Sequence, residues 1–593
     1  MPPIVQPTPP GRQGPCPGLA RRAGHLRRHD NRRMLLPRPS FNAAASLALL
    51  ALCCASAAAQ PAGLVPGTHS PLPAAVAEAL QRAKVPADAL AAVVLPLTRA
   101  GPRWQFQADR PMQPGSTMKL VTSIVALDLL GPNHRGFTEL LTAAPQQGER
   151  GEVLAGDLVL RGGADPELGL PQLWEMLAEL RHGAGIREIT GDIVIDRTLF
   201  RPHRPELGQP PFDEQPEFPY NMVPDALQLG GNLLAIELTS QDPARPGEIS
   251  ARAVPPLPGL LIDASAMRLS DRACKDWDDD WLSPPQVDEP EPGTLRVRLQ
   301  GGFPRACSQR QELQLIDRLA LAERQLRWVW QGLGGEWRGR AREASTPLIA
   351  PVSPAAAAAT AAAAAPDQPA PLPGANALAP GVAWAGAAAT TPPGVRLLAR
   401  HLARPWGEVL RTMNKQSDNA FTRLLFLELG LAGMADEPGA TTAALADRAV
   451  RRWLLDHDIG SAGLVLDNGS GLSRSERTTP RQLALMLKAA QQGRWGPELL
   501  MSLPVAGVDG TMRNRLKTSP AAGTARLKTG TLRNATGLAG YVTDAQGRAW
   551  AFAAMVNHDN AAAARPALDA LADWVARGGM ALRGRTGQAV LSR

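Results

Sequence analysis

The chain has 593 residues and a formal net charge of +8, a balance that first suggests a nucleic-acid-binding protein. However, residues 1–59 contain eight arginines and one acidic residue and so carry +7, which leaves +8 − 7 = +1 for residues 60–593. Residues 60–593 therefore lack the excess of positive charge with which a protein neutralises a phosphate backbone. The charge distribution therefore argues against a nucleic-acid partner.

Residues 1–59 read as a secretory signal peptide: an Arg-rich stretch precedes an apolar segment that ends in three alanines before Gln60. The apolar centre, residues 43–54, is shorter than the ~20 residues of a membrane-spanning helix, so we favour cleavage over the alternative of a membrane anchor. Met34 is an alternative start that leaves a leader of ordinary length. We expect export to the periplasm and leave association with the membrane surface open.

Residues 60–150 are predicted to form the first part of a transpeptidase-like α/β domain. Their patterns predict a helix at 74–84, strands at 91–97 and 104–108, and an apolar helix at 116–130 that stops at Gly-Pro. A strand-rich insert is predicted over residues 151–346, with short β-type runs and one helix near 171–181. The runs are at residues 158–160, 193–195, 234–238 and 295–299.

Cys274 and Cys307, both in this insert, are the only cysteines beyond the leader. An even pair in an oxidising compartment predicts one disulfide, the alternative being two buried free thiols. No Cys/His spacing suits zinc and no Gly-rich phosphate loop occurs, so we predict no metal and no cofactor.

Residues 347–394 are rich in Ala and Pro and are expected to form a flexible surface segment, or alternatively a short Ala helix. Residues 395–593 are predicted to complete the α/β domain. The expected elements are helices near 418–429, 440–455 and 480–491, strands at 526–531, 538–542 and 549–556, and a final helix at about 564–577. The predicted fold is thus α/β (α+β): an antiparallel sheet with flanking helices, interrupted by the insert.

Lysine is scarce in this chain, with seven lysines against 56 arginines. A chain that meets its surface-charge needs with Arg has little reason to keep Lys except where a titratable amine is needed. Two lysines stand in short motifs, residues 116–119 (Ser-Thr-Met-Lys) and 528–530 (Lys-Thr-Gly). Lys119 and Lys528 are therefore candidates for chemistry.

Ser116 is predicted to begin a helix, and a spacing of three places Lys119 one turn later on the same face. A serine hydroxyl becomes a nucleophile when a base accepts its proton, and lysine can do so if burial or a nearby cation lowers its pKa. Alone, this motif more commonly means a capped helix with a surface lysine.

Residues 417–419 (Ser-Asp-Asn) offer a hydroxyl for proton relay and an amide for a peptide-like substrate, while Asp418 is expected to serve structure. Lys528 and Gly530 share one face of a predicted strand, so that Gly530 leaves room for a substrate and Lys528 supplies positive charge. A helix cap and a strand ending in a turn are the respective alternatives.

The three motifs together, in this order, are those of serine penicillin-recognising enzymes. About 300 residues separate Ser116 from Ser417, and no Glu-x-x-Leu-Asn motif follows, unlike class A β-lactamases. The chain resembles the D-alanyl-D-alanine carboxypeptidase/endopeptidase family of penicillin-binding protein 4 type, peptidase family S13. The resemblance spans nearly all of the chain beyond the leader and rests also on residues 161–166, 191–196, 467–474, 503–507 and 528–532.

This resemblance implies that Ser116 attacks the bond between two D-alanines of a peptidoglycan stem peptide, with Lys119 as base. Ser417 would pass the proton to the leaving amine and Asn419 would order the substrate. It also implies an oxyanion hole from the backbone of Ser116 and Thr531, and carboxylate binding by Lys528 with Thr529. Asp196 and Arg474 would contact the diamino acid of the stem peptide, and β-lactams would acylate Ser116.

Two other functions stay open: a β-lactamase or esterase on the same scaffold, or a catalytically idle cell-wall-binding module. The balance between carboxypeptidase and endopeptidase action and the oligomeric state do not follow from these residues.

Overall fold

The computed structural model describes residues 70–98, 103–208, 210, 212–213, 215–242, 245, 247–344, 394–432 and 439–580. The predicted signal peptide lies outside the described residues, as does all of the Ala/Pro-rich segment except its last residue, Gly394.

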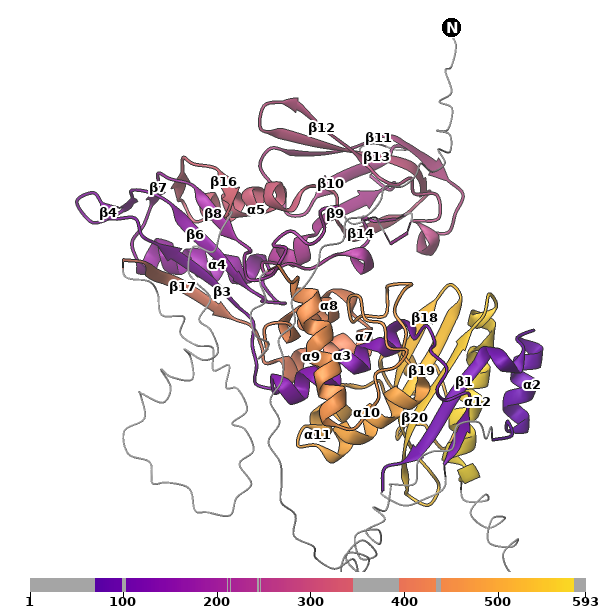
Figure 1. Cartoon of the computed structure of the whole chain (residues 1–593). Coiled ribbons are helices and arrows are strands. Elements are labelled where there is room, and N and C mark those ends of the chain that lie inside the picture. The colour runs from indigo at the N-terminus through magenta and orange to yellow at the C-terminus, as the bar shows by residue number, and fades with distance from the viewer. Residues whose placement is uncertain are drawn as a thin grey trace, which may run out of the picture. The chain divides into compact units, whose positions relative to one another are not determined.

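The predicted antiparallel sheet is present and has five strands in the order β18-β19-β20-β1-β2 (Figure 1). The first two strands in the sequence, β1 and β2, join three strands from the C-terminal part of the chain through β20, which pairs with β1 from Leu90↔Val556 to Pro96↔Trp550. The strands are β1 (Leu90–Pro96), β2 (Trp104–Phe106), β18 (Arg526–Leu532), β19 (Ala535–Thr543) and β20 (Ala549–Asn557).

Both faces of this sheet are covered, because successive side chains of a strand point to opposite sides. Ala91, Val93 and Leu95 of β1 belong to one buried apolar cluster, whereas Leu90 and its alternating neighbours Ala92 and Val94 belong to another. The second cluster is covered by α2 (Ala74–Arg82) and α12 (Arg565–Ala576), which also contact each other. The first is covered by α3 (Lys119–Leu129) and α10 (Pro480–Gln492), on the other side of the sheet (Figure 1).

The remaining helices of this domain extend the first cluster. They are α7 (Trp406–Gln416), α8 (Asn419–Leu429), α9 (Thr442–Asp456) and α11 (Gly496–Ser502). All four helices predicted after residue 394 start within two residues of the expected position, as α8, α9, α10 and α12. The helices α7 and α11 were not predicted. The α10 helix begins with a capping box, in which Thr479 and Gln482 satisfy each other's backbone N–H groups.

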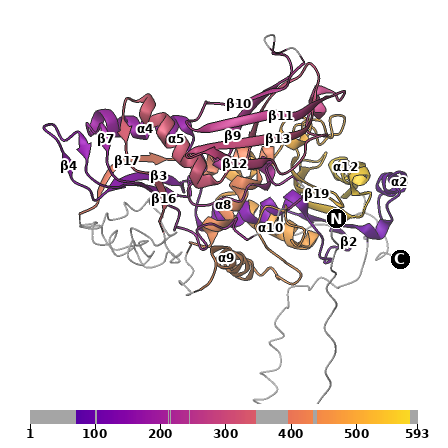
Figure 2. The same ribbon diagram turned by 90° about the horizontal axis from the view of Figure 1, so that it is seen from above.

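The first part of the insert is built on a five-stranded sheet in the order β16-β8-β6-β3-β17. Its strands are β3 (Phe137–Thr142), β6 (Leu158–Gly163), β8 (Ile193–Asp196), β16 (Ala341–Glu343) and β17 (Arg396–Leu402). Figure 2 shows β17 beside β3, with which it pairs antiparallel. The predicted insert limits, residues 151 and 346, are therefore wrong, since the sheet takes one strand from before and one from after them. The hydropathy pattern did not show whether β3 and β17 belong to the sheet of the α/β domain or to that of the insert.

A smaller sheet of short strands, β4 (Gln146–Gln147), β5 (Val153–Leu154), β7 (Glu188–Ile189) and β15 (Glu336–Trp337), shares a core with this first sheet. Two helices cover that core, α4 (Leu170–Ala178) and α5 (Arg318–Gly332). The expectation of a single helix in the insert is wrong, because α5 was missed. Its Leu326, Val329 and Trp330 are buried at helical spacing.

The second part of the insert has two three-stranded sheets, β10-β9-β14 and β11-β13-β12, around an aromatic core that contains Trp277 and Trp281. The strands are β9 (Leu234–Thr239), β10 (Ser250–Ala253), β11 (Leu260–Ser270), β12 (Gln286–Glu291), β13 (Thr294–Pro304) and β14 (Ser308–Leu313). Cys274 and Cys307 form a disulfide at the edge of this core.

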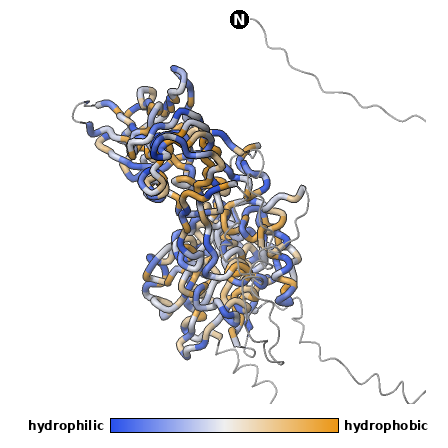
Figure 3. The backbone as a smooth tube through the Cα atoms, turned by 90° about the vertical axis from the view of Figure 1, so that its left-hand side faces the viewer, coloured by the Kyte–Doolittle hydropathy of each residue, from blue (hydrophilic) through white to orange (hydrophobic). Residues whose placement is uncertain are grey.

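Hydrophobic and hydrophilic residues alternate over short stretches of the described backbone (Figure 3). Within the described ranges, no helix has both the length and the apolar character needed to cross a bilayer.

Candidate active site

Ser116 and Lys119 lie where the chain enters α3. Residues Gly115–Met118 form one tight helical turn, and α3 continues directly from it. Gly115 begins this turn with a φ of 51°, a conformation that suits glycine. The turn places the Nζ atom of Lys119 3.1 Å from the Oγ atom of Ser116. The pairing predicted from the spacing of three is thus a hydrogen bond in the structure.

Lys119 is completely buried, and two more oxygens surround its amine. Nζ donates to the Oδ1 atom of Asn419 at 2.7 Å and to the carbonyl oxygen of Ser470 at 2.6 Å. Burial lowers the pKa of Lys119 to about 7, against the opposing influence of the Glu476 and Asp418 carboxylates. A substantial fraction of this amine is therefore uncharged near neutral pH and able to accept a proton.

The second motif lies between two helices. Ser417 ends α7 in the left-handed conformation, with φ 64°, and Asp418 caps α8 by accepting a hydrogen bond from the backbone N–H of Phe421. Because the chain changes direction sharply here, Ser417 Oγ accepts a hydrogen bond from Lys528 Nζ at 2.8 Å and Asn419 Oδ1 accepts one from Lys119 Nζ. The structural role expected for Asp418 is the one that the structure shows.

The third motif lies on β18, which runs beside the turn that carries Ser116. Lys528 is completely buried and its pKa is held well below the usual value by burial and then by the nearby Lys119. The hydroxyl of Thr529 donates to that of Thr511 at 2.8 Å, and Thr531 is exposed. The backbones approach closely here: a Cβ atom on Gly115 would lie 2.9 Å from the backbone nitrogen of Thr531.

Gly530 permits this approach, because a Cβ atom at this position would lie 2.3 Å from the carbonyl oxygen of Pro114. We expect Gly530→Ala to displace β18 from Ser116 and to lower the second-order rate of acylation by a fluorescent penicillin about a hundredfold, as small misplacements of reacting groups do. Gly460→Ala is the matched control, since nothing lies within 4 Å of a Cβ atom there. A Gly530→Ala rate within about twofold of the control would contradict this role.

The insert also reaches this site. Asn419 Nδ2 donates to the carbonyl oxygen of Tyr220 at 3.0 Å, and Arg423 of α8 donates to the carbonyl oxygens of Asn221 and Met222. Sequence reasoning placed no site residue in this segment. These contacts are made by backbone carbonyl groups, which every residue type has, so the side chains of this segment could not predict them.

The two remaining predicted substrate contacts have different outcomes. The guanidinium of Arg474 is exposed and lies 5.1 Å from the centre of the Phe212 ring of the insert. By contrast, Asp196 is 3% exposed and accepts hydrogen bonds from the backbone N–H and the hydroxyl of Thr198. The structure does not bring Asp196 into the cluster, because this carboxylate is used by its own turn, and we do not retain it as a substrate contact.

Sequence reasoning also missed Ser470 and Glu476. Both belong to a segment whose first part, residues 467–474, was noted as a motif, but no role followed from residue type. The completely buried Glu476 accepts hydrogen bonds from the backbone N–H groups of residues 467, 468, 469 and 471, and the carbonyl oxygen of Ser470 accepts one from Lys119.

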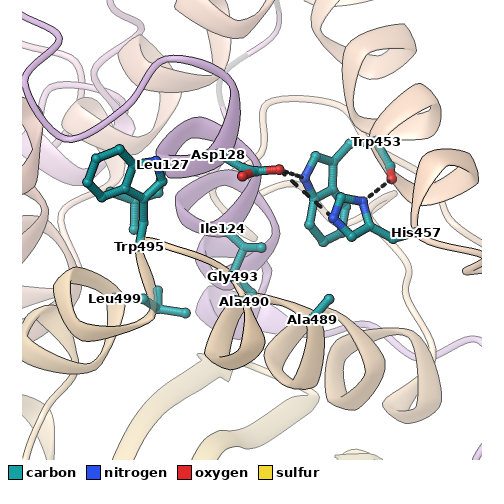
Figure 4. A pocket seen from close by; sticks show the side chains of 10 residues that line it. All are labelled: Ile124, Leu127, Asp128, Trp453, His457, Ala489, Ala490, Gly493, Trp495 and Leu499. Atoms are coloured by element: carbon teal, nitrogen blue, oxygen red, sulfur yellow. Dashed lines mark hydrogen bonds and ion pairs between the residues drawn. The ribbon is translucent and has the colours of Figure 1, made fainter. Parts of the chain in front are cut away.

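A separate small pocket lies between α3, α9, α10 and α11 (Figure 4). There the Oδ2 atom of Asp128 accepts a hydrogen bond from Trp453 Nε1 at 2.8 Å, and the rings of Trp453 and His457 stack with their centres 3.9 Å apart. Its volume of about 30 Å³ has room for a water molecule, far less than the hundreds of Å³ typical of a ligand pocket. This pocket is therefore not a second substrate site.

In the part of the chain that the structure describes, no cluster of three or more His, Cys, Asp or Glu side chains is arranged to hold a metal ion. The chemistry available to the cluster is that of its own hydroxyls, amines and amides: a serine beside a buried lysine, with a second serine and lysine facing them.

The family model described as "D-Ala-D-Ala carboxypeptidase 3 (S13) family" matches residues 72–362 and 351–578. The D-alanyl-D-alanine carboxypeptidase DacB of Haemophilus influenzae is 27% identical over 461 residues, which cover 75% of this chain and 80% of that protein. The D-alanyl-D-alanine carboxypeptidase of Actinomadura sp. is 28% identical over 474 residues, 77% of this chain and 76% of that protein.

The fold has a solved counterpart as well. The crystal structure of penicillin binding protein 4 (dacB) from Haemophilus influenzae matches with a TM-score of 0.63 and 22% identity, over 84% of this chain and 99% of that one. The family inferred from the motifs is confirmed: this protein belongs to the D-Ala-D-Ala carboxypeptidase 3 (S13) family.

Proposed function

We propose that this protein is a serine-type D-Ala-D-Ala carboxypeptidase that acts on peptidoglycan stem peptides through an acyl-enzyme on Ser116. One observation carries the proposal: the amine of Lys119, completely buried and with a pKa of about 7, lies 3.1 Å from the Ser116 hydroxyl. A hydroxyl and an uncharged amine at this distance are a nucleophile and its base. Membership of the S13 family supports the same reaction.

In the first step, Ser116 Oγ would attack the carbonyl carbon between the two D-alanines while its proton passes to Lys119 Nζ. The backbone N–H groups of Ser116 and Thr531 would hold the resulting oxyanion. They border the close approach made possible by Gly115 and Gly530, and such donors contribute on the order of a hundredfold or more in rate.

In the second step, the C–N bond would break and the proton would reach the leaving amine through Ser417. Asn419 would order the amide of the substrate, and water would then hydrolyse the ester on Ser116. The hydrogen bond from Lys528 to Ser417 and that from Lys119 to Asn419 hold both residues beside the proposed nucleophile and base, which supports these two roles.

Lys528 and Thr529 would bind the terminal carboxylate of the substrate. Burial favours the uncharged form of Lys528, so a positive charge there is costly until an anion arrives. A bound carboxylate would raise the pKa of this amine again. Lys528 would thus bind a proton and the carboxylate together, which favours an anionic chain end over a neutral amide.

Arg474 is retained as a proposed contact for the diamino acid of the stem peptide, because its guanidinium is exposed beside Phe212. Endopeptidase action on cross-links, acylation by β-lactams and a periplasmic location are further parts of this proposal. The solved relative from Haemophilus influenzae with a bound β-lactam, at a TM-score of 0.57, has the same fold.

The function is tested by incubating the purified protein with a stem pentapeptide that ends in D-Ala-D-Ala and measuring the release of D-alanine. Rapid turnover of nitrocefin without D-alanine release would instead favour a β-lactamase. An absence of labelling by fluorescent penicillin would favour an idle binding module. Digestion of purified sacculi separates trimming of chain ends from cutting of cross-links by its products.

The acylation rate is expected to depend on pH through Lys119. Only the uncharged amine accepts a proton, and with a pKa of about 7 this form increases as pH rises. The second-order rate of penicillin acylation should therefore rise through neutral pH and level off above about pH 8. Stopped-flow labelling over a pH series measures it, and a flat rate between about pH 5.5 and pH 8.5 would contradict a lysine base.

A further inference from the structure

Glu476 is a buried acid that no step of the proposed reaction uses. Its side chain is completely buried, and backbone N–H groups of a single short loop surround its carboxylate. Oε1 accepts from Asp467 at 3.3 Å, Asn468 at 3.1 Å and Gly469 at 2.7 Å, and Oε2 accepts from Gly471 at 2.7 Å. Convergent backbone N–H groups of this kind form a binding site for an anion, and here the Glu476 carboxylate occupies it. Burial raises the pKa of Glu476, and the four backbone N–H groups oppose that rise because they stabilise the charged form.

The loop, residues 467–471, is shaped for this arrangement and for close contact with the active site. Gly469 and Gly471 have φ values of 70° and 81°, which glycine adopts readily. A Cβ atom on Gly471 would lie 1.9 Å from the carbonyl oxygen of Gly115 and 2.9 Å from the nitrogen of Ser116. The loop therefore lies directly against the backbone that carries the nucleophile.

Two carbonyl groups of the loop face α3. The carbonyl oxygen of Ser470 accepts from Lys119 Nζ at 2.6 Å, and that of Gly469 accepts from the hydroxyl of Thr122, one turn further along α3, at 2.8 Å. An uncharged lysine amine has two N–H donors and one lone pair. If Ser470 and Asn419 accept the two N–H groups, the lone pair is left for the hydroxyl of Ser116.

We propose that Glu476 is a positioning residue for the reaction at Ser116: by holding the 467–471 loop, it fixes the Ser470 carbonyl that orients the Lys119 amine. The inference rests on the proposed function, because it concerns the same serine and lysine. In this proposal the buried carboxylate of Glu476 orients the lone pair of Lys119 Nζ without contacting that amine.

Glu476 also belongs to the set of charges around Lys119. Asp418 and Arg423 face the amine from the α8 segment, Lys528 faces it from β18, and Glu476 faces it from behind the loop. The two carboxylates favour the charged amine, whereas Arg423 and Lys528 oppose it. Loss of the Glu476 charge should therefore make Lys119 easier to deprotonate, although it leaves the amine less well oriented.

The test is Glu476→Gln in the full chain. The amide keeps the shape of the side chain but turns an NH2 group toward one of the backbone N–H donors, which loosens the loop. We expect the plateau rate of acylation by fluorescent penicillin, per titrated active site, to fall about tenfold to a hundredfold. We also expect the rise of that rate with pH to move to lower pH by about half a unit or more, because the negative charge is gone.

The variant Glu476→Asp tests the effect of side-chain length separately from that of charge. It keeps the charge but is one methylene shorter, so the rate per active site should fall about fivefold or more while the pH rise stays near its wild-type position. Glu139→Gln is the matched control, a buried carboxylate in β3 that pairs with Arg161 and Arg400, away from the cluster, and it should change neither quantity.

A rate for Glu476→Gln within about twofold of wild type, or a pH rise that does not move, would overturn the inference. If Glu476→Gln does not fold, a Glu476→Asp rate within about twofold of wild type would overturn it instead. Failure of the proposed function would give a different result, because the wild-type protein itself would then not be labelled by penicillin.

Discussion

Ser116→Ala is expected to abolish labelling by fluorescent penicillin and to lower the rate of D-alanine release by about 10⁴-fold or more, because no other group would form the acyl-enzyme. The measurement is gel fluorescence after incubation with the label, together with D-alanine release from the stem pentapeptide. The fold should be unaffected, since Ser116 is partly exposed and its hydroxyl contacts Lys119.

Ser123→Ala is the matched control on the same helix. Ser123 is buried and exchanges hydrogen bonds with Asn414, so its loss should cost about 1–3 kcal/mol of stability without affecting labelling. Persistent, stoichiometric labelling of Ser116→Ala would show that another residue carries the acyl group, and the proposed mechanism would be wrong.

Lys119→Arg is expected to lower the acylation rate about 10²- to 10⁴-fold, the usual contribution of a positioned general base. Arginine keeps the positive charge but does not deprotonate in proteins, so the hydroxyl of Ser116 would have no base. The bulkier guanidinium would also have to fit where the amine now meets Ser116, Asn419 and Ser470. The second-order rate of penicillin acylation is the quantity to measure.

Two readouts make the Lys119 experiment decisive. The rise in rate with pH near 7 should disappear in Lys119→Arg, because the group that titrates there is gone. Lys488→Arg on α10, whose amine donates to the carbonyl oxygen of Thr98 outside the cluster, should keep both the rate and the pH profile. Retention of the wild-type profile in Lys119→Arg would assign the base to another group.

Local pattern was enough to predict the five-stranded sheet of the α/β domain and most of its helices. The nearly continuous apolar runs of β1, β19 and β20, the cap before α10 and the turn before α3 are properties of short segments, so the observed elements lie close to the expected positions. The pattern failed where tertiary pairing decides. Strands β3 and β17 mix apolar and polar residues and were not predicted. Only the pairing of β17 with β3 and of β3 with β6 assigns them to the insert.

The site divides in the same way. Motif spacing placed Ser116 and Lys119 on one face of a turn, and motif order indicated Ser417, Asn419 and Lys528. The residue types of Ser470 and Glu476 did not indicate a role. Ser470 contacts Lys119 through its backbone carbonyl, and Glu476 accepts hydrogen bonds from four backbone N–H groups. For Asp196, a motif match suggested a substrate contact, and burial beside Thr198 removed it.

The amino-acid sequence by itself determined which reactive side chains this protein possesses, their local spacing and the family to which it belongs. Only the tertiary structure decided that segments some 300 residues apart meet at one amine, Nζ of Lys119, which the carboxamide of Asn419 contacts. It also decided that this amine is buried enough for its pKa to fall to about 7. The physical reason is desolvation: a lysine becomes a base through what surrounds it, and its surroundings come from the whole fold.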